Sequence, residues 1–421
     1  MAQRVEWLDG LRGWAAFVTV IGHLDMWWHT GAIERGYRYL HDVYETTPVS
    51  ILCYVAVHVF FIISGFALSY PVLRSDWRSR TLINMAAVRY FRLAIPVTAS
   101  VAIAYWLYAT GLIFSHQAGE MTQSPWLAYF YGFRDGPPPF WKFSLYDVFF
   151  FPYRHPTWNP VLWTMKVELA ASFYVFALLA LPWRRVRIAI ALVFAVYLLP
   201  KWSFGFMVGY LAAEFYNPER QWSERIAWAW LGGGFAIGML LLSPYVVGPG
   251  ILFARMSYIT FSNLLAAVLF IGFMLSGTAR AALSNPLSRF LGWISFPLYL
   301  MHFLVIVSLG AGLCVWLLPS AGFGLTFLIV AVATIVVSVL VSILFAMVIE
   351  DIVLTRVKAL VKELVDACMR GAASALRSAP GVVRIRDWGF RWGSPGHAGA
   401  RDRQLQDQGP PGPKPIAAQE A

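Results

Sequence analysis

Residues 8–23 read LDGLRGWAAFVTVIGH, and they are the clearest indication of the fold class. It is a run of apolar and small residues that holds Arg12 near its start and His23 at its end. Ionisable groups inside a run apolar enough to cross a bilayer are costly, and they usually serve chemistry or transport. The stretch therefore predicts the first helix of a membrane protein whose function lies inside the membrane.

The composition of the whole chain agrees with this prediction. The 421 residues are 59% hydrophobic and 13% charged, and the mean hydropathy is +0.60. Such a balance excludes an ordinary soluble globular domain. Eight runs approach or exceed the roughly 17 to 25 residues that a spanning helix needs, and they cover residues 13–28, 51–70, 93–114, 161–181, 226–242, 256–275, 290–318 and 322–349.

A further apolar stretch, residues 188–213, is interrupted by Pro200 and Lys201. It can form one kinked span or a hairpin of two short helices. The hairpin keeps the Arg-rich loops and the basic C-terminal region on the cytoplasmic side, as the positive-inside tendency requires. We therefore predict an all-α polytopic membrane protein with about ten transmembrane helices and both termini in the cytoplasm. A bacterial inner membrane is the expected location, although a protein of a eukaryotic endomembrane would have a similar hydropathy.

Three domains are expected. Residues 1–351 form the membrane domain, and residues 352–377 carry apolar residues at helical spacing beside lysines and arginines, which predicts an amphipathic helix on the inner leaflet. Residues 378–421 are rich in Gly, Pro, Arg and Gln, which predicts a disordered basic tail. Topology and anionic lipid head groups account for the net charge of +11, so nucleic acid is not expected as a partner.

Arg12 and His23 are eleven residues apart, which places them on nearly one helical face about 16 Å from each other along the axis. An imidazole at that depth can take a proton from a hydroxyl group. A histidine that is hydrogen-bonded to a neighbouring helix is an equal alternative. Arg89 and Arg92 lie one helical turn apart and suit a phosphate-bearing ligand, although a positive-inside anchor explains the pair as well.

Lys166 and Glu168 are two residues apart, so they point to different sides of their helix and cannot neutralise one another. Glu168 is expected to need an Arg or His partner, either for a structural ion pair or for catalysis. Lys166 can instead extend its side chain towards the membrane surface. His302 follows Tyr299 by one turn, and it is expected to bond a backbone carbonyl or to orient a substrate.

Two further observations limit the candidate chemistry. Ser64 and Gly65 are small residues that favour close helix packing. The three cysteines are isolated, so neither a disulfide framework nor a zinc site is supported, and no metal is expected.

Taken together, these motifs resemble the membrane acyltransferase-3 family of polytopic O-acyltransferases. The pieces that carry the resemblance are LDGLRGWAAFVTVIGH, VFFIISGF, the Arg89 and Arg92 pair, WNPVLWTMKVEL and PLYLMHFLV. The resemblance implies a catalytic role for His23 and use of the acyl donor by Arg89 and Arg92. Counting all matching polar positions, we assign catalysis to His23 and Glu168, donor binding to Arg12, Arg89 and Arg92, and acceptor support to His302, Tyr299 and Lys166.

The resemblance also implies the reaction. An acyl group, with acetyl as the first choice, would pass from acetyl-CoA or another acyl-CoA to a hydroxyl of a cell-surface or secreted carbohydrate or glycolipid, with no bound cofactor. The family commonly has WSL-x-VE where this chain has WTMKVE, and an acidic or small polar residue is frequent where His58 stands, which affects the acceptor site. The alternatives are a secondary transporter that uses intramembrane His, Lys and Glu, and a membrane scaffold with a basic tail.

Overall fold

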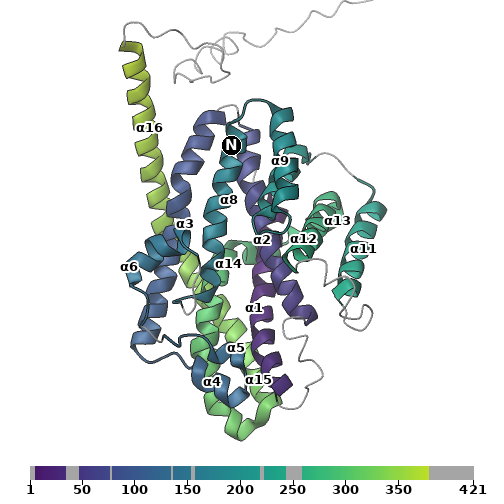
Figure 1. Ribbon diagram of the computed structural model, residues 1–421, viewed down its shortest axis with the longest axis vertical. Helices are drawn as coiled ribbons and strands as arrows, with labels where there is room; N and C mark the ends of the chain where they lie inside the picture. The colour runs from purple at the N-terminus through teal and green to yellow at the C-terminus, as the bar shows by residue number, and fades with distance from the viewer. Residues whose placement is uncertain are drawn as a thin grey trace, which may run out of the picture. The chain divides into compact units, whose positions relative to one another are not determined.

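The computed structural model describes residues 5–34, 47–75, 78–133, 136–152, 157–218, 222–242 and 258–378, and every regular element within these residues is a helix (Figure 1). The all-α prediction is thus confirmed for the described chain. Two compact units divide it, Met1–Pro380 and Gly381–Ala421. The second unit, which holds nearly all of the predicted tail, lies outside the described residues.

The long helices are α1 (Glu6–Glu34), α2 (Pro48–Leu73), α3 (Arg78–Ala109), α8 (Trp163–Ala180), α9 (Arg184–Leu198), α10 (Phe204–Phe215), α11 (Glu224–Leu242), α12 (Tyr258–Leu275), α14 (Pro286–Val305), α15 (Ala311–Phe345) and α16 (Thr355–Ser378). Short elements join them, namely α4 (Ser115–Thr122), α5 (Pro125–Ala128), α6 (Phe140–Lys142), η2 (Phe143–Asp147), α7 (Val148–Phe150), η3 (Pro160–Leu162), α13 (Gly277–Leu283), η4 (Ile306–Gly310) and η5 (Ala346–Leu354).

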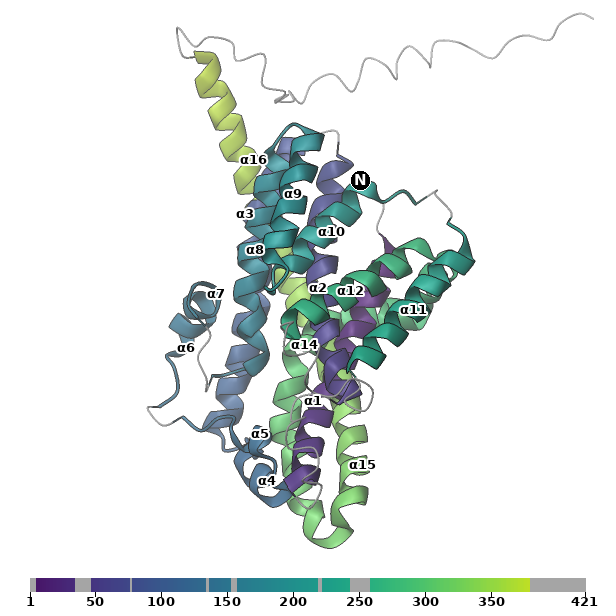
Figure 2. The same ribbon diagram turned by 45° about the vertical axis from the view of Figure 1, so that its right-hand side comes forward.

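Four helical segments among the described residues are long and apolar enough to cross a membrane, or five if α12 and α13, which meet at 97°, form one broken span. The four are Ile51–Leu73, Arg78–Ala109, Pro160–Ala180 and Pro286–Gly371. The last combines two predicted spans, because the chain turns back within α15 at Gly322, whose φ of 72° favours glycine (Figure 2).

Helix length and mean hydropathy, taken together as the criterion for a clear span, support fewer spans than the ten predicted. The helix α1 does not meet it, because polar residues such as His23 and Asp25 lower its hydropathy. The predicted hairpin in residues 188–213 is confirmed as α9 and α10, with 15 and 12 residues. At 1.5 Å per residue they are about 22 and 18 Å long, which is less than the roughly 30 Å of a hydrocarbon core.

Helices α1 and α14 run side by side in the same direction, and glycine makes their approach close. A Cβ atom on Gly13 would lie 2.4 Å from the Gly292 nitrogen, and one on Gly292 would lie 2.4 Å from the Asp9 carbonyl oxygen. Small residues at such contacts let helix backbones meet. The start of α14 is set by Asn285, whose side chain accepts the Ser288 N–H at 2.8 Å.

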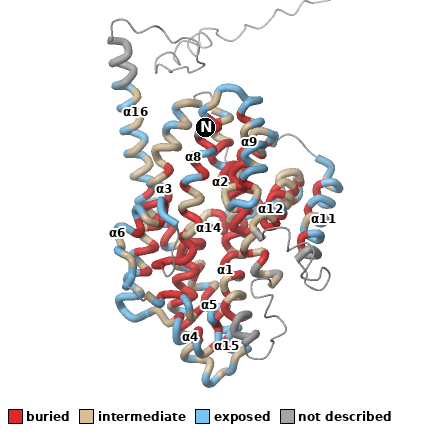
Figure 3. Tube along the Cα trace, viewed as in Figure 1, coloured by how far each residue is buried: buried red, intermediate tan, exposed pale blue. Residues whose placement is uncertain are grey.

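A second close pair joins α2 and α10. A Cβ atom on Gly65 would lie 2.3 Å from the Phe206 carbonyl oxygen, and one on Gly209 would lie 2.0 Å from that of Ile62. The prediction that Gly65 permits close packing is confirmed. Buried residues concentrate along α1, α2 and α14, whereas α16 is largely exposed or half-buried (Figure 3).

Candidate active site

A cavity of about 170 Å³ opens among α1, α2, α3, α8, α14, η5 and the start of α16. It brings together five residues that the sequence singled out: Arg12, Arg89, Arg92, Glu168 and Tyr299. Two further charged groups, Glu350 and Lys358, also line it, beside an apolar wall that includes Phe60, Leu93, Met165 and Phe296. A charged, partly apolar pocket of this kind is the default position for a ligand.

Arg89 and Glu168 form a buried ion pair in this cavity. The Arg89 Nη2 lies 2.5 Å from the Glu168 Oε1, and the side chains are only 6% and 13% exposed. Arg89 Nε donates to the Ser172 hydroxyl at 2.7 Å, and the Ser64 hydroxyl donates to Glu168 Oε1 at 2.6 Å. The prediction that Glu168 needs its own basic partner is confirmed, and the cluster joins α2, α3 and α8.

Arg92 differs from Arg89 although it lies only one turn further along α3. Its side chain is exposed, and it forms no hydrogen bond or ion pair within 4.0 Å with any described residue. The two arginines of the RxxR pair therefore do different work. Arg89 holds Glu168, whereas Arg92 offers its guanidinium group to the cavity.

Arg12 lines the same cavity from α1 and is held towards α14. Its Nε donates to the Ser295 hydroxyl at 2.8 Å, and its Nη2 donates to the Gly292 carbonyl at 3.0 Å. Nη2 also lies 3.4 Å from the Asp9 carboxylate. These partners fix the direction of the side chain, so Arg12 adds positive charge at a defined place.

His23 and His302 form a histidine pair that does not line the cavity but lies next to Tyr299, which does. The His23 Nδ1 lies 2.8 Å from the His302 Nε2, and the His302 Nδ1 lies 2.8 Å from the Leu298 carbonyl oxygen. The carbonyl bond predicted for His302 is thus confirmed. Because a carbonyl only accepts, His302 Nδ1 carries a proton, and in a neutral His302 the Nε2 atom must accept from His23 Nδ1. The His23 Nε2 then keeps its lone pair, as a general base requires.

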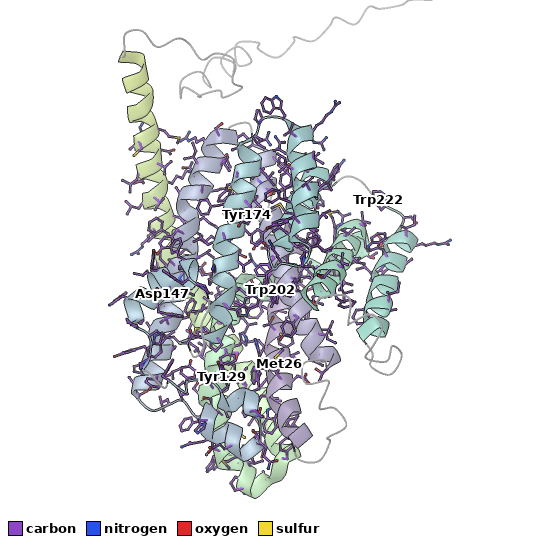
Figure 4. All side chains as sticks on the ribbon, viewed as in Figure 1. Met26, Tyr129, Asp147, Tyr174, Trp202 and Trp222 are labelled. Carbon is purple, nitrogen blue, oxygen red and sulfur yellow. The ribbon has the colours of Figure 1, made fainter. Side chains whose placement is uncertain are left out.

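Aromatic rings frame the histidine pair. The His23 ring stacks on Trp126 with 6.0 Å between centroids, and it meets the edge of Phe303 at 5.6 Å. Trp126 belongs to α5, which begins at Ser124 and Pro125 with the Ser124 hydroxyl accepting the Leu127 N–H. Tyr129, labelled in Figure 4, is 54% exposed directly after α5. His23 therefore lies between the cavity and a surface rich in aromatic side chains.

Tyr299 connects the cavity to the histidine pair. Its ring lines the cavity, and the ring centroid lies 6.1 Å from that of His302 and 5.7 Å from that of Phe60. The Tyr299 hydroxyl donates to the Val161 carbonyl at 2.8 Å and lies 3.0 Å from the Thr164 hydroxyl. These bonds hold the ring between the two parts of the site.

The structure leaves two candidates apart from this site. Lys166 is half-buried on α8 and does not line the cavity. His58 is buried, and its Nδ1 donates to the Tyr54 carbonyl at 2.8 Å. Its ring stacks on that of Trp202, with 4.7 Å between the centroids; Trp202 is labelled in Figure 4. Within the described ranges, no group of three or more His, Cys, Asp or Glu is placed to hold a metal ion.

The sequence did not predict four residues of the site, which are Ser64, Ser172, Glu350 and Lys358. Ser64 is expected from its sequence position to serve packing, yet its hydroxyl bonds Glu168. Lys358 belongs to the segment predicted as a separate amphipathic helix. The available signal was the occurrence of Glu350 and Lys358 directly after the last apolar run, but only the fold brings them to Arg92.

The fold and the site define a helical membrane protein in which a charged cavity adjoins a buried histidine pair. A family model described as an acyltransferase domain matches residues 5–347, and the chain belongs to this acyltransferase-3 family. The O-acetyltransferase PaAT-1 of Phomopsis amygdali is 24% identical over 388 residues, with 74% of each chain covered. No solved structure matches the chain.

Proposed function

We propose that this acyltransferase moves an acetyl group from acetyl-CoA to a hydroxyl of a carbohydrate or glycolipid. Family membership and the O-acetyltransferase relative support O-acyl transfer. The observation that carries the proposal is the arrangement of the site, in which Tyr299 connects a cavity rich in cations to the histidine pair. A cationic rim suits the phosphates of a CoA thioester, and the histidine pair suits an acceptor hydroxyl.

Only part of the acetyl-CoA molecule would fit inside the cavity. A cavity of about 170 Å³ is smaller than the roughly 300 to 1,000 Å³ of pockets that enclose drug-sized ligands. We place the thioester and its apolar arm between Phe60, Leu93 and Phe296, and the phosphates beside Arg92 and Arg12. In this pose the acyl carbon points towards Tyr299 and the histidine pair.

The proposed reaction is a direct transfer. His23 Nε2 takes the proton of the acceptor hydroxyl, and the oxygen attacks the acyl carbon. A C–O bond forms, the C–S bond breaks, and the thiolate leaves with the proton that His23 returns. His302 holds His23 Nδ1 by the 2.8 Å hydrogen bond, so that the lone pair of Nε2 faces the acceptor.

The other predicted residues have supporting roles in this mechanism. Glu168 acts through Arg89, because the ion pair between them keeps α3 and α8 together at the cavity. Tyr299 positions the donor beside His302. Lys166 lies outside the cavity, and its role in acceptor support stays a prediction from its position inside an apolar run.

The proposed topology places the cavity on the cytoplasmic side and α4 with α5 on the opposite side. Both termini then lie in the cytoplasm, and the ten-helix count includes α1, α9, α10 and α11 as spans. The location is a bacterial inner membrane, where acyl-CoA is available on one face and surface glycans are built on the other.

The test compares purified wild type with His23→Ala and Arg92→Ala variants. We would measure acetyl-CoA binding, and CoA release with a cell-envelope glycan mixture as the acceptor. We expect release by wild type, normal binding without release by His23→Ala, and weakened binding by Arg92→Ala. If wild type neither binds nor consumes acyl-CoA, the proposal is wrong, and uptake of solute into vesicles would then favour the transporter alternative.

A further inference from the structure

The donor cavity includes residues beyond the acyltransferase domain. The family model ends at residue 347, yet Glu350, Leu354 and Lys358 line the cavity from η5 and the first turn of α16. These helices continue α15 without a break. The segment that follows the last apolar run therefore contributes one wall of the site.

The charges in the cavity are unevenly matched. Four cations, Arg12, Arg89, Arg92 and Lys358, face two carboxylates, Glu168 and Glu350, which leaves a net charge of +2. The Arg89 and Glu168 charges cancel in their ion pair. Among the described residues, neither Arg92 nor Lys358 forms a hydrogen bond or an ion pair within 4.0 Å, so both retain N–H groups for an anion.

Glu350 is the carboxylate that lies among Arg12, Arg92 and Lys358 in the cavity. It interacts electrostatically with Arg12, Arg92 and Lys358, at distances too long for an ion pair within 4.0 Å. Arg12 has a second carboxylate nearby in Asp9, 3.4 Å away, and Asp351 also acts on Lys358. Among the described residues, however, no carboxylate oxygen lies within 4.0 Å of the Arg92 guanidinium or the Lys358 ammonium group. An incoming phosphate would supply those oxygens.

The position of Lys358 is set by packing on both sides. Leu354, one turn before it, is 2% exposed. Two turns after it, Asp366 binds Arg80 of α3 through two contacts, Nε to Oδ1 at 3.1 Å and Nη2 to Oδ2 at 2.8 Å. A paired contact of this kind fixes geometry better than a single ion pair. The first turns of α16 are thus held against α3, and Lys358 is held beside Arg92.

We infer that Lys358 is an anion-binding residue of the donor cavity, which binds a phosphate group of coenzyme A together with Arg92. The inference rests on the proposed function and extends the donor site past the family domain. Glu350 balances the two cations when the cavity is empty and weakens binding when the donor is present.

The experiment uses the full chain in detergent and measures the dissociation constant for acetyl-CoA by calorimetry. The variants are Lys358→Ala, Glu350→Gln and, as a matched control, Lys362→Ala, which removes an exposed lysine one turn further along α16. We expect Lys358→Ala to weaken binding about tenfold, as the loss of a charge-assisted hydrogen bond predicts. Lys362→Ala should change it less than about twofold, and Glu350→Gln should tighten it a few-fold.

A second titration with 3′-dephospho-CoA identifies the phosphate. A tenfold loss that persists assigns Lys358 to the diphosphate, and a loss that disappears assigns it to the 3′-phosphate. The inference is wrong if Lys358→Ala binds like wild type while its unfolding midpoint without donor is unchanged, or if Lys362→Ala loses as much affinity. Absence of binding by wild type would instead contradict the proposed function.

Discussion

The histidine pair and the charged cavity are adjacent but are built in different ways. His23 and His302 come from two helices, α1 and α14, that glycines bring into close contact, and aromatic rings enclose them. The charged cavity gathers side chains from seven elements across the length of the chain. The first arrangement suits chemistry, because two rigid helices fix one proton-accepting atom. The second suits binding, because many charges share one ligand.

The largest expected effect among the tests of this contrast belongs to His23→Ala. If the histidine pair serves chemistry alone, the turnover number should fall about 10³-fold, because the general base is lost. The dissociation constant for acetyl-CoA should change less than about twofold. Stopped-flow CoA release and calorimetry measure the two quantities. A large loss of donor affinity would show that the two regions are not separable.

The Glu168→Ala variant tests the ion pair in the cavity. It leaves Arg89, whose side chain is 6% exposed, without its carboxylate partner. Breaking one side of a buried pair costs about 3 to 5 kcal/mol, so the unfolding midpoint in detergent should fall sharply. Replacing both Arg89 and Glu168 by leucine should recover part of this loss. If Glu168→Ala is as stable as wild type, the ion pair has no structural role.

His302 offers a finer test of the histidine pair. His302→Ala removes the acceptor for His23 Nδ1, and we expect the turnover number to fall about 10²-fold. His302→Gln supplies a carbonyl oxygen that can accept the same proton, so it should retain more activity than alanine. The pH–rate profile should shift for alanine and stay close to wild type for glutamine. If both variants lose the same amount of activity and neither pH–rate profile shifts, His302 serves only packing.

Arg92 tests the binding side of the contrast. Arg92→Ala should raise the dissociation constant for acetyl-CoA about tenfold and weaken its dependence on salt, because a charged contact is lost. The turnover number at saturating donor should stay nearly unchanged. Initial rates over a range of donor concentrations separate the two effects. A fall in turnover without a change in affinity would contradict the assignment.

The smallest expected effect belongs to Tyr299→Phe, which keeps the ring between cavity and histidines but removes its hydroxyl. The hydroxyl bonds to Val161 and Thr164 are worth about 1 kcal/mol, so stability should fall slightly and activity should fall a few-fold. Thermal unfolding and CoA release measure both. A loss of activity as large as that of His302→Ala would place the hydroxyl in the reaction itself.

Much of the site could be predicted because ionisable residues in apolar runs are few and must find partners. The need of Glu168 for a basic partner and the carbonyl bond of His302 followed from that physical argument. The choice of Arg89 over Arg92 as the partner could not be predicted, because one helical turn separates the two and only packing against α8 buries one of them. Among the described residues, length and hydropathy together support four or five clear spans, and the prediction of ten also counts the short helices α9 and α10.

By itself the sequence determined the helical membrane class, the family and the placement of His23 and Arg12 on one face, since these depend on local composition and on the helical period. Tertiary structure alone decided that His302 meets His23, that Arg89 pairs with Glu168, and that Lys358 reaches the cavity. Contacts between residues 79 to 286 positions apart depend on how helices pack, which no local pattern records. The residue types of the candidate site can thus be read from the sequence, whereas its geometry is set by close contact between helices.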